Sequence, residues 1–242
     1  MTIETETVMQ VELLQPWSTF VMKTQLPPEI LQKMLKITDE LIASPEIVSW
    51  GENLAGQIEQ EFLIPPEILE REDVMGYFKD VVLRFLIEQF IQSFPQDQED
   101  ILKEKFWIDL GNMWGVSQKD NEYNPVHVHT NCAVSTVMYL KIPEYLPDRK
   151  RAYQSLLKGD FDGGIQFFNN ASQDRIWGAT SMKVQPQVGD FFIFPASQQH
   201  LVYPFRTPDG KGERRSVSFN AKFTRKSEYD ALRKQQEEQE VI

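Results

Sequence analysis

The sequence predicts a mixed α+β fold that is mainly β, in which helices pack on one face of a sandwich or barrel. Two regions with different hydrophobic periodicity support this prediction. Apolar residues recur at mostly helical spacing from Pro27 to about Pro95, whereas short apolar runs alternate with turn residues from Phe106 onward. A chain of 242 residues, 41% of them hydrophobic, is compatible with one well-buried unit, so we expect a single domain over residues 1–242.

Two helical stretches are expected in the N-terminal part, residues 1–105. The stretch "PPEILQKMLKITDELIAS" opens with proline and an early glutamate, and its apolar residues have helical spacing: Ile30, Met34, Ile37 and Leu41. The stretch "PPEILEREDVMGYFKDVVLRFLIEQFIQSF" repeats this start and carries a broad apolar stripe: Val74, Phe78, Val81, Val82, Phe85 and Phe90. We expect the stripe to face the core.

Seven short strands are expected in residues 106–223, separated by Gly-Asp, Gly-Gly and Pro-Asp-Gly turns. They are "FWIDLGNMWGV", "CAVSTVMYLKI", "GGIQFFN", "SMKVQPQ", "GDFFIFP", "HLVYPF" and "RRSVSFNAKF". Residues 224–242 are charged and helix-prone, which predicts a C-terminal helix or tail. The first ten residues are acidic and are expected to be disordered.

Charge and cysteine content exclude several classes of protein. The formal net charge is −11 and "DRKR" is the one basic cluster, which argues against nucleic acid as a partner. The N-terminus lacks the features of a signal peptide, and no apolar run is long enough for a membrane span. A single cysteine, Cys132, rules out an intrachain disulfide and suits the cytoplasm. The sequence gives no indication of the oligomeric state.

The segment "NPVHVHTN" contains two of the three histidines of the chain. On a strand, His127 and His129 would point to the same side and could share one metal ion. The third, His200, follows an apolar run and could reach the same pocket from a neighbouring strand. The pair alone is equally compatible with ordinary histidines of a sheet. Cys132 lies close by, where a small buried apolar role is commoner than a role as ligand or nucleophile.

The segments that follow the pair have a characteristic order. A strand ending "MYLKIP" is followed by "GGIQFF", then by "VGDFFIFPASQQH" with His200, and last by "RRSVSFN", whose first arginine lies 14 residues beyond His200. This order resembles the Fe(II)- and 2-oxoglutarate-dependent oxygenases, in particular the prolyl-hydroxylase-like branch with its bacterial and phage members. The resemblance covers about residues 106–223. It implies a double-stranded β-helix, or jelly roll, backed by the N-terminal helices.

The resemblance also implies a metal site. His127 would be the first ligand of Fe(II) and His200 the distal ligand. The family normally has Asp or Glu two residues after the first histidine, where this chain has His129. We expect His129 to take that place in a three-histidine site. The alternatives are water, Asn131, or a carboxylate from elsewhere in the chain, Asp162 or Asp190.

A second set of residues is expected to bind 2-oxoglutarate as cosubstrate. An arginine at the start of the last strand can form a two-pronged bond to a carboxylate. Strand alternation places Arg214, Ser216 and Asn220 on a polar face and Arg215 on an apolar one, so Arg214 is preferred and Arg215 is second. Tyr139 matches a tyrosine that bonds the same carboxylate in the family. Further expected pocket-lining residues are Asn131, Gln166 and Asn220, and more weakly Asn112 and Trp114.

These residues predict an Fe(II)- and 2-oxoglutarate-dependent dioxygenase that uses dioxygen to hydroxylate a substrate the sequence does not name. The insertion "PEYLPDRKRAYQSLLKGDFD" and the helical region are expected to shape the substrate entrance. Two other functions stay open. One is a three-histidine, cupin-like thiol dioxygenase without 2-oxoglutarate, and the other is a non-catalytic jelly roll that binds metal.

Overall fold

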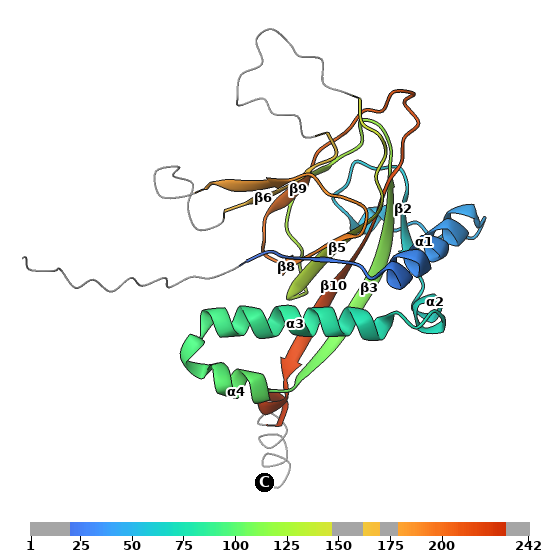
Figure 1. Cartoon of the computed structure of the whole chain (residues 1–242). Coiled ribbons are helices and arrows are strands. Elements are labelled where there is room, and N and C mark those ends of the chain that lie inside the picture. Colours follow the sequence, from blue (N-terminus) through green and yellow to red (C-terminus); the bar gives the residue numbers. More distant parts are fainter. Residues whose placement is uncertain (1–19, 147–161, 170–178, 231–242) are drawn as a thin grey trace, which may run out of the picture.

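The computed structural model describes residues 20–146, 162–169 and 179–230, and it shows a layer of helices and two antiparallel sheets (Figure 1). The larger sheet has the spatial order β1 (Met22–Gln25), β8 (Asp190–Pro195), β5 (Val134–Lys141), β10 (Arg214–Arg225), β3 (Phe106–Gln118) and β2 (Glu61–Ile64). The smaller sheet has the order β4 (Asn124–His127), β9 (His200–Val202), β6 (Ile165–Phe168) and β7 (Ser181–Val184). The predicted α+β, mainly β fold is confirmed, and all seven expected strands are present as β3 and β5 to β10.

The N-terminal part contains several helices, and the first two begin where the proline signals predict. The helices are α1 (Pro28–Ala43), α2 (Pro66–Arg71), α3 (Met75–Ser93) and α4 (Gln98–Lys103), with 3-10 turns η1 (Gly51–Asn53) and η2 (Pro95–Asp97). The second predicted stretch forms two helices instead of one. The chain breaks at Asp73, whose φ of 52° lies in the left-handed region and ends α2 before α3 starts.

The N-terminal part is less helical than expected, because it also supplies two strands of the larger sheet. β1 pairs with β8 at one edge, and β2 pairs with β3 at the other. Both are four residues long, and "MKTQ" and "EFLI" show no clear alternation of apolar and polar residues. Their pairing partners lie 49 or more residues away in sequence, so only the tertiary fold defines them.

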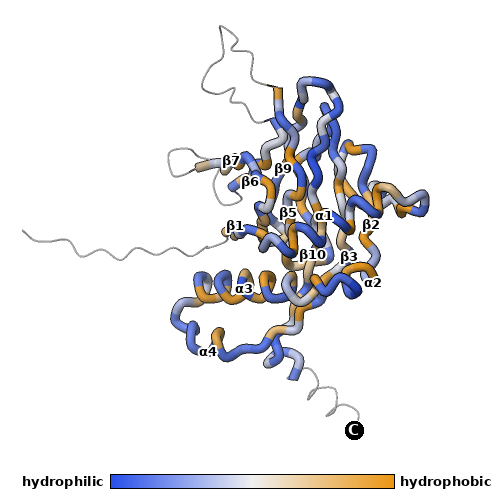
Figure 2. Tube along the Cα trace, turned by 45° about the vertical axis from the view of Figure 1, so that its right-hand side comes forward, coloured by the Kyte–Doolittle hydropathy of each residue, from blue (hydrophilic) through white to orange (hydrophobic). Residues whose placement is uncertain are grey.

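Two apolar clusters hold the three layers together. The first joins the helices to one face of the larger sheet and includes Phe78, Phe85 and Phe219, which confirms that the stripe of α3 faces the core. Figure 2 shows this amphipathicity as alternating orange and blue along α3. The second cluster lies between the sheets, where Tyr139 and Phe192 of the larger sheet pack with Phe167 and others of the smaller one. The helices therefore cover the outer face of the larger sheet and leave its inner face for a site between the sheets.

Several expectations fall on residues outside the described ranges. These are the acidic first ten residues, "DRKR", most of the insertion after Pro143, and the C-terminal segment from residue 231. Of the expected C-terminal helix, residues 226–230 are described and are helical. Within the described residues, no helix is both long enough and apolar enough to cross a membrane.

Candidate metal centre

Three histidines converge between the two sheets. β4 and β9 pair antiparallel with His127 directly opposite His200, and their ring centroids are 4.2 Å apart. The ring centroid of His129 lies 5.3 Å from that of His127 and 5.4 Å from that of His200. One ligand nitrogen of each residue lies within 4.8 Å of the other two. Ligand nitrogens this close together could share one metal ion.

The strand that carries the histidine pair is shorter than predicted. β4 ends at His127, so His129 lies in the loop that follows. Its backbone N–H donates to the carbonyl of Ala196, at 2.9 Å, which fastens the loop to the segment between β8 and β9. The imidazole also packs beside Trp114 of β3, with 6.1 Å between ring centroids. These contacts keep the His129 ring beside the other two without strand geometry.

The histidines are neutral and partly pre-oriented. Nδ1 of His127 lies 2.7 Å from the carbonyl oxygen of Pro125, and Nδ1 of His200 lies 2.8 Å from that of Gln198. A carbonyl only accepts, so Nδ1 carries the proton in both rings and Nε2 keeps a free lone pair. Burial lowers the pKa of His129 to about 4 and that of His200 to about 3, and it also lowers the pKa of His127. Neutral imidazole with a free nitrogen is the form that binds metal.

The carboxylates considered as alternative ligands are bound elsewhere. Asp162 forms an ion pair with Arg206 at 3.2 Å, and Asp190 forms one with Lys23 at 2.9 Å. Within the described ranges, neither joins the group of three histidines. Asn131 lines the cavity that opens beside the histidines. Its φ of 58° is a left-handed conformation, which asparagine tolerates.

A cavity of about 470 Å³ opens beside the histidines. Its wall includes the inner faces of β3, β5 and β10 and the loop after β4. Arg214 lines it and is 1% exposed. The Nη1 group of Arg214 donates to the carbonyl of Gly163 and the Nη2 group to Oε1 of Gln118, while Nε has no partner among the described residues.

Tyr139 lies next to this arginine. Its ring centroid is 5.5 Å from the guanidinium carbon of Arg214. The side chain is fully buried, and its hydroxyl has no hydrogen-bond partner in the described part of the chain. Burial raises the pKa of Tyr139 to about 12, so the hydroxyl is a donor at neutral pH. An unpaired buried hydroxyl next to an unpaired guanidinium N–H is a site suited to an anion.

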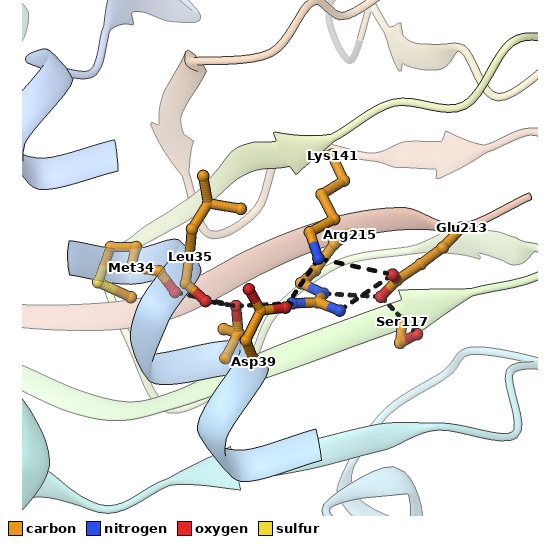
Figure 3. A network of polar contacts seen from close by, with 8 residues as sticks. Met34, Leu35, Asp39, Ser117, Lys141, Glu213 and Arg215 are labelled. Carbon is orange, nitrogen blue, oxygen red and sulfur yellow. Dashed lines mark hydrogen bonds and ion pairs between the residues drawn. The ribbon is translucent and has the colours of Figure 1, made fainter. Parts of the chain in front are cut away.

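Arg215 faces the opposite side of β10. Its guanidinium donates to both carboxylate oxygens of Glu213 and to Asp39 of α1 (Figure 3). Lys141 of β5 also donates to Asp39, at 2.7 Å, and the Ser117 hydroxyl donates to Glu213, at 2.8 Å. These contacts tie α1 to the larger sheet. Arg215 therefore has a structural set of partners, and this placement supports Arg214 as the anion-binding residue.

The other predicted lining residues divide into two groups. Ser216 and Asn220 line the cavity, and Oδ1 of Asn220 is buried without a partner among the described residues. Gln166 does not line it, contrary to expectation. Its amide nitrogen donates to the Ser181 hydroxyl at 2.7 Å, and its oxygen accepts from Tyr203. Alternation along β6 sends the neighbours of Gln166 into the apolar cluster between the sheets and turns Gln166 away from it.

Residues with weaker sequence support also lie at the cavity. Asn112 and Trp114 both contribute to its wall. Cys132 is half-buried at the wall, outside the group of histidines, and burial raises the pKa of its thiol. A thiol with a raised pKa is a poor nucleophile at neutral pH, in agreement with a packing role.

One further part of the cavity wall comes from the N-terminal region, which was expected to shape the substrate entrance but for which no residue was named. It consists of Trp50, Asn53, Leu54, Ala55 and Glu61. Glu61 is 3% exposed although it is a carboxylic acid. The sequence feature that could have indicated a buried role for Glu61 is its place at the start of an otherwise apolar run, "EFLI".

Comparison with protein families finds one match, which covers part of the chain. Residues 112–220 match the family described as "Putative 2OG-Fe(II) oxygenase". The matched segment contains the three histidines, Tyr139 and Arg214. The chain matches no curated protein.

The chain is also similar to solved structures. A prolyl-4-hydroxylase from Pseudomonas putida has 14% identity and a TM-score of 0.51, over 85% of this chain and 93% of that one. A viral collagen prolyl hydroxylase from Paramecium Bursaria Chlorella virus-1, in a complex with 2OG, has 13% identity and a TM-score of 0.46, over 83% and 94%. A 2OG-Fe(II) oxygenase family oxidoreductase from Burkholderia pseudomallei has 13% identity and a TM-score of 0.46, over 83% and 84%. At this identity, the Pseudomonas likeness shows the fold alone, the expected double-stranded β-helix.

Proposed function

We propose that the chain is an Fe(II)- and 2-oxoglutarate-dependent dioxygenase of the 2OG-Fe(II) oxygenase family and that it hydroxylates an unidentified substrate. In this proposal His127, His129 and His200 hold the metal. Arg214, Tyr139 and Ser216 bind the cosubstrate. The observation that carries the proposal is one cavity that is lined both by the three neutral histidines and by the unpaired anion site of Arg214 and Tyr139.

The residues that line the cavity fit both a divalent metal ion and 2-oxoglutarate. Three neutral imidazoles are a donor set for a divalent transition metal. The unpartnered Arg214 Nε and Tyr139 hydroxyl would be costly to leave buried without an anion. A carboxylate of 2-oxoglutarate satisfies both donors. Fe(II), 2-oxoglutarate and dioxygen together supply the oxidising power for C–H hydroxylation.

The protein's own contribution is positioning and exclusion of water. Gln118 and the carbonyl of Gly163 hold the Arg214 guanidinium so that its orientation does not depend on the ligand. Phe194 and Phe167 pack against His200, with ring centroids 4.8 Å and 6.0 Å away, and form an apolar wall behind the ligand. Such a wall keeps water away from a reactive centre.

The replacement of the usual carboxylate by His129 changes the charge of the site. Three neutral ligands leave the full charge of a divalent ion uncompensated, whereas a carboxylate would cancel one unit. The site in this chain is therefore more positive, which favours the dianionic cosubstrate. A thiol dioxygenase would share the three histidines but would need no 2-oxoglutarate.

The test is binding of Fe(II) and 2-oxoglutarate under anaerobic conditions, followed by the visible metal-to-ligand charge-transfer band. We expect the band in the wild type. In Arg214→Ala, loss of a charged hydrogen bond worth about 1.5–3 kcal/mol should raise the Kd for 2-oxoglutarate about 10- to 150-fold with iron binding unchanged. Arg215→Ala is the matched control, because the neighbouring arginine faces α1, and its band should persist in the folded fraction. Iron binding without any band would refute the proposal.

A further inference from the structure

Glu61 is a buried carboxylic acid in the wall of the cavity. It is the first residue of β2, the edge strand of the larger sheet. Strand alternation sends Phe62 and Ile64 into the core under the helices and leaves Glu61 on the inner face, where it lines the cavity. Glu61 is 3% exposed. The fold therefore holds a carboxyl group at the same cavity as the candidate metal centre.

The Glu61 carboxyl has no protein partner that accounts for its burial. Oε2 is buried without a hydrogen bond, and among the described residues no Lys, Arg or His forms an ion pair with this side chain. The chain packs closely around it. A Cβ placed on Gly56 would lie 2.5 Å from Oε1 of Glu61 and 2.7 Å from Oδ1 of Asn124. A glycine at position 56 therefore makes room for the carboxyl between its loop and β4.

Glu61 and the cosubstrate site lie at opposite ends of one row of paired residues that crosses the inner face of the larger sheet. Glu61 pairs with Val116 of β3, Val116 pairs with Ser216 of β10, and Ser216 pairs with Tyr139 of β5. With strands about 4.8 Å apart, this line puts Glu61 roughly 14 Å from Tyr139. Of the two strands between them, β3 carries Trp114, which packs against His129. The metal centre, the anion site and the carboxyl group therefore line one cavity.

The other charges at the cavity do not neutralise Glu61. Arg214 is held by Gln118 and Gly163 at the cosubstrate end. Lys222 also lines the cavity, but its position is opposite Asp109, seven residues from Val116 along β3 and so more than about 20 Å away. Burial raises the pKa of Glu61 to about 7, and the nearby Glu122 raises it too. A cation beside the carboxyl would lower this pKa again and remove the penalty of burial.

We propose that Glu61 binds a positively charged group of the substrate, so that the enzyme acts on a compound with an ammonium or guanidinium group. The proposal rests on the proposed oxygenase function for the identity of the reaction, but not for the cation site. The carboxylate of Glu61 accepts N–H bonds from the cationic end of the substrate, while the remainder extends over β3 towards the histidines. The net charge of −11 favours the approach of such a compound.

The test compares n-butylammonium with 1-butanol as probes of the same length, on protein loaded with Fe(II) and 2-oxoglutarate without oxygen. Trp50 and Trp114 line the cavity, so intrinsic tryptophan fluorescence reports binding without turnover. At pH 8 we expect the wild type to bind n-butylammonium at least about 10-fold more tightly than 1-butanol, from a charge-assisted bond of about 1.5–3 kcal/mol. Glu61→Gln should lose this preference. Glu52→Gln, the same change at an exposed position of η1, should keep it.

The outcomes separate this inference from the proposed function. Equal binding of the two probes to the wild type overturns the inference, whatever becomes of the variants. A preference that survives in Glu61→Gln overturns it as well, because another group then holds the cation. The charge-transfer band with 2-oxoglutarate should be the same in the wild type and in Glu61→Gln. A wild type that shows the probe preference but no band would keep the cation site and reject the oxygenase function.

Discussion

The unpaired Glu61 carboxyl makes a quantitative prediction about the stability of the protein without ligand. Its pKa in the folded state is raised to about 7 from an ordinary value of 4.5. The folded state therefore binds the proton more tightly than the unfolded state between these two pH values. Stability contributed by this group is fully present below about pH 4.5 and is lost as the pH rises through 7. The difference of about 2.5 pKa units corresponds to about 3 kcal/mol at alkaline pH.

Replacement of Glu61 by glutamine tests this reasoning, because the amide has the same shape and never ionises. We expect Glu61→Gln to be more stable than the wild type by up to about 3 kcal/mol at pH 8.5, and similar to it at pH 4.5. For a chain of this size, the gain corresponds to a rise in Tm of roughly 6–12 °C. Thermal or urea unfolding at pH 4.5, 6, 7 and 8.5 measures the difference in stability between the variant and the wild type. The contributions of all other titratable groups cancel in this difference.

A matched variant shows whether the change in stability comes from the burial of the Glu61 carboxyl. Glu52→Gln changes the same functional group at an exposed position, and it should alter stability by no more than about 0.5 kcal/mol at any pH. A difference between Glu61→Gln and the wild type that does not grow with pH would refute the reasoning. So would a wild type that is the more stable of the two at pH 8.5, because Glu61 would then have a stabilising partner.

Two further predictions concern the metal and cosubstrate sites. Tyr139→Phe should weaken 2-oxoglutarate binding about 2- to 12-fold, the loss of one hydrogen bond of about 0.5–1.5 kcal/mol, with Fe(II) affinity unchanged, as measured by titration of the charge-transfer band. The opposite result, an unchanged Kd, would assign the tyrosine to packing alone. His129→Asp should still bind Fe(II), since a carboxylate is an ordinary ligand there, but should bind 2-oxoglutarate more weakly because the site loses one positive charge. Tighter cosubstrate binding in that variant would contradict the charge argument.

Local patterns predicted the parts of the fold whose geometry is set by neighbouring residues. Alternation along β10 separated Arg214 from Arg215, and the structure places these adjacent arginines on opposite faces, one at the cavity and one against α1. Gln166 was expected at the pocket without an alternation argument. Phe167 and its apolar neighbours define the inner face of β6, and one residue of register turns Gln166 away from it. His129 shows the converse case, since it lies beyond β4 and is held by a tertiary contact to Ala196.

The contribution of the N-terminal region to the site could not be predicted in the same way. β2 is a short edge strand, and its partner β3 begins more than 40 residues later in the chain. Without that pairing, nothing places Glu61 at the cavity, and a glutamate after "QIEQ" looks like a solvated residue. The informative feature of the sequence is a conflict between residue type and position: a charged side chain starts an apolar strand and becomes buried with it. Such conflicts are expected at functional sites, where a ligand can complete a buried carboxyl that otherwise lowers stability.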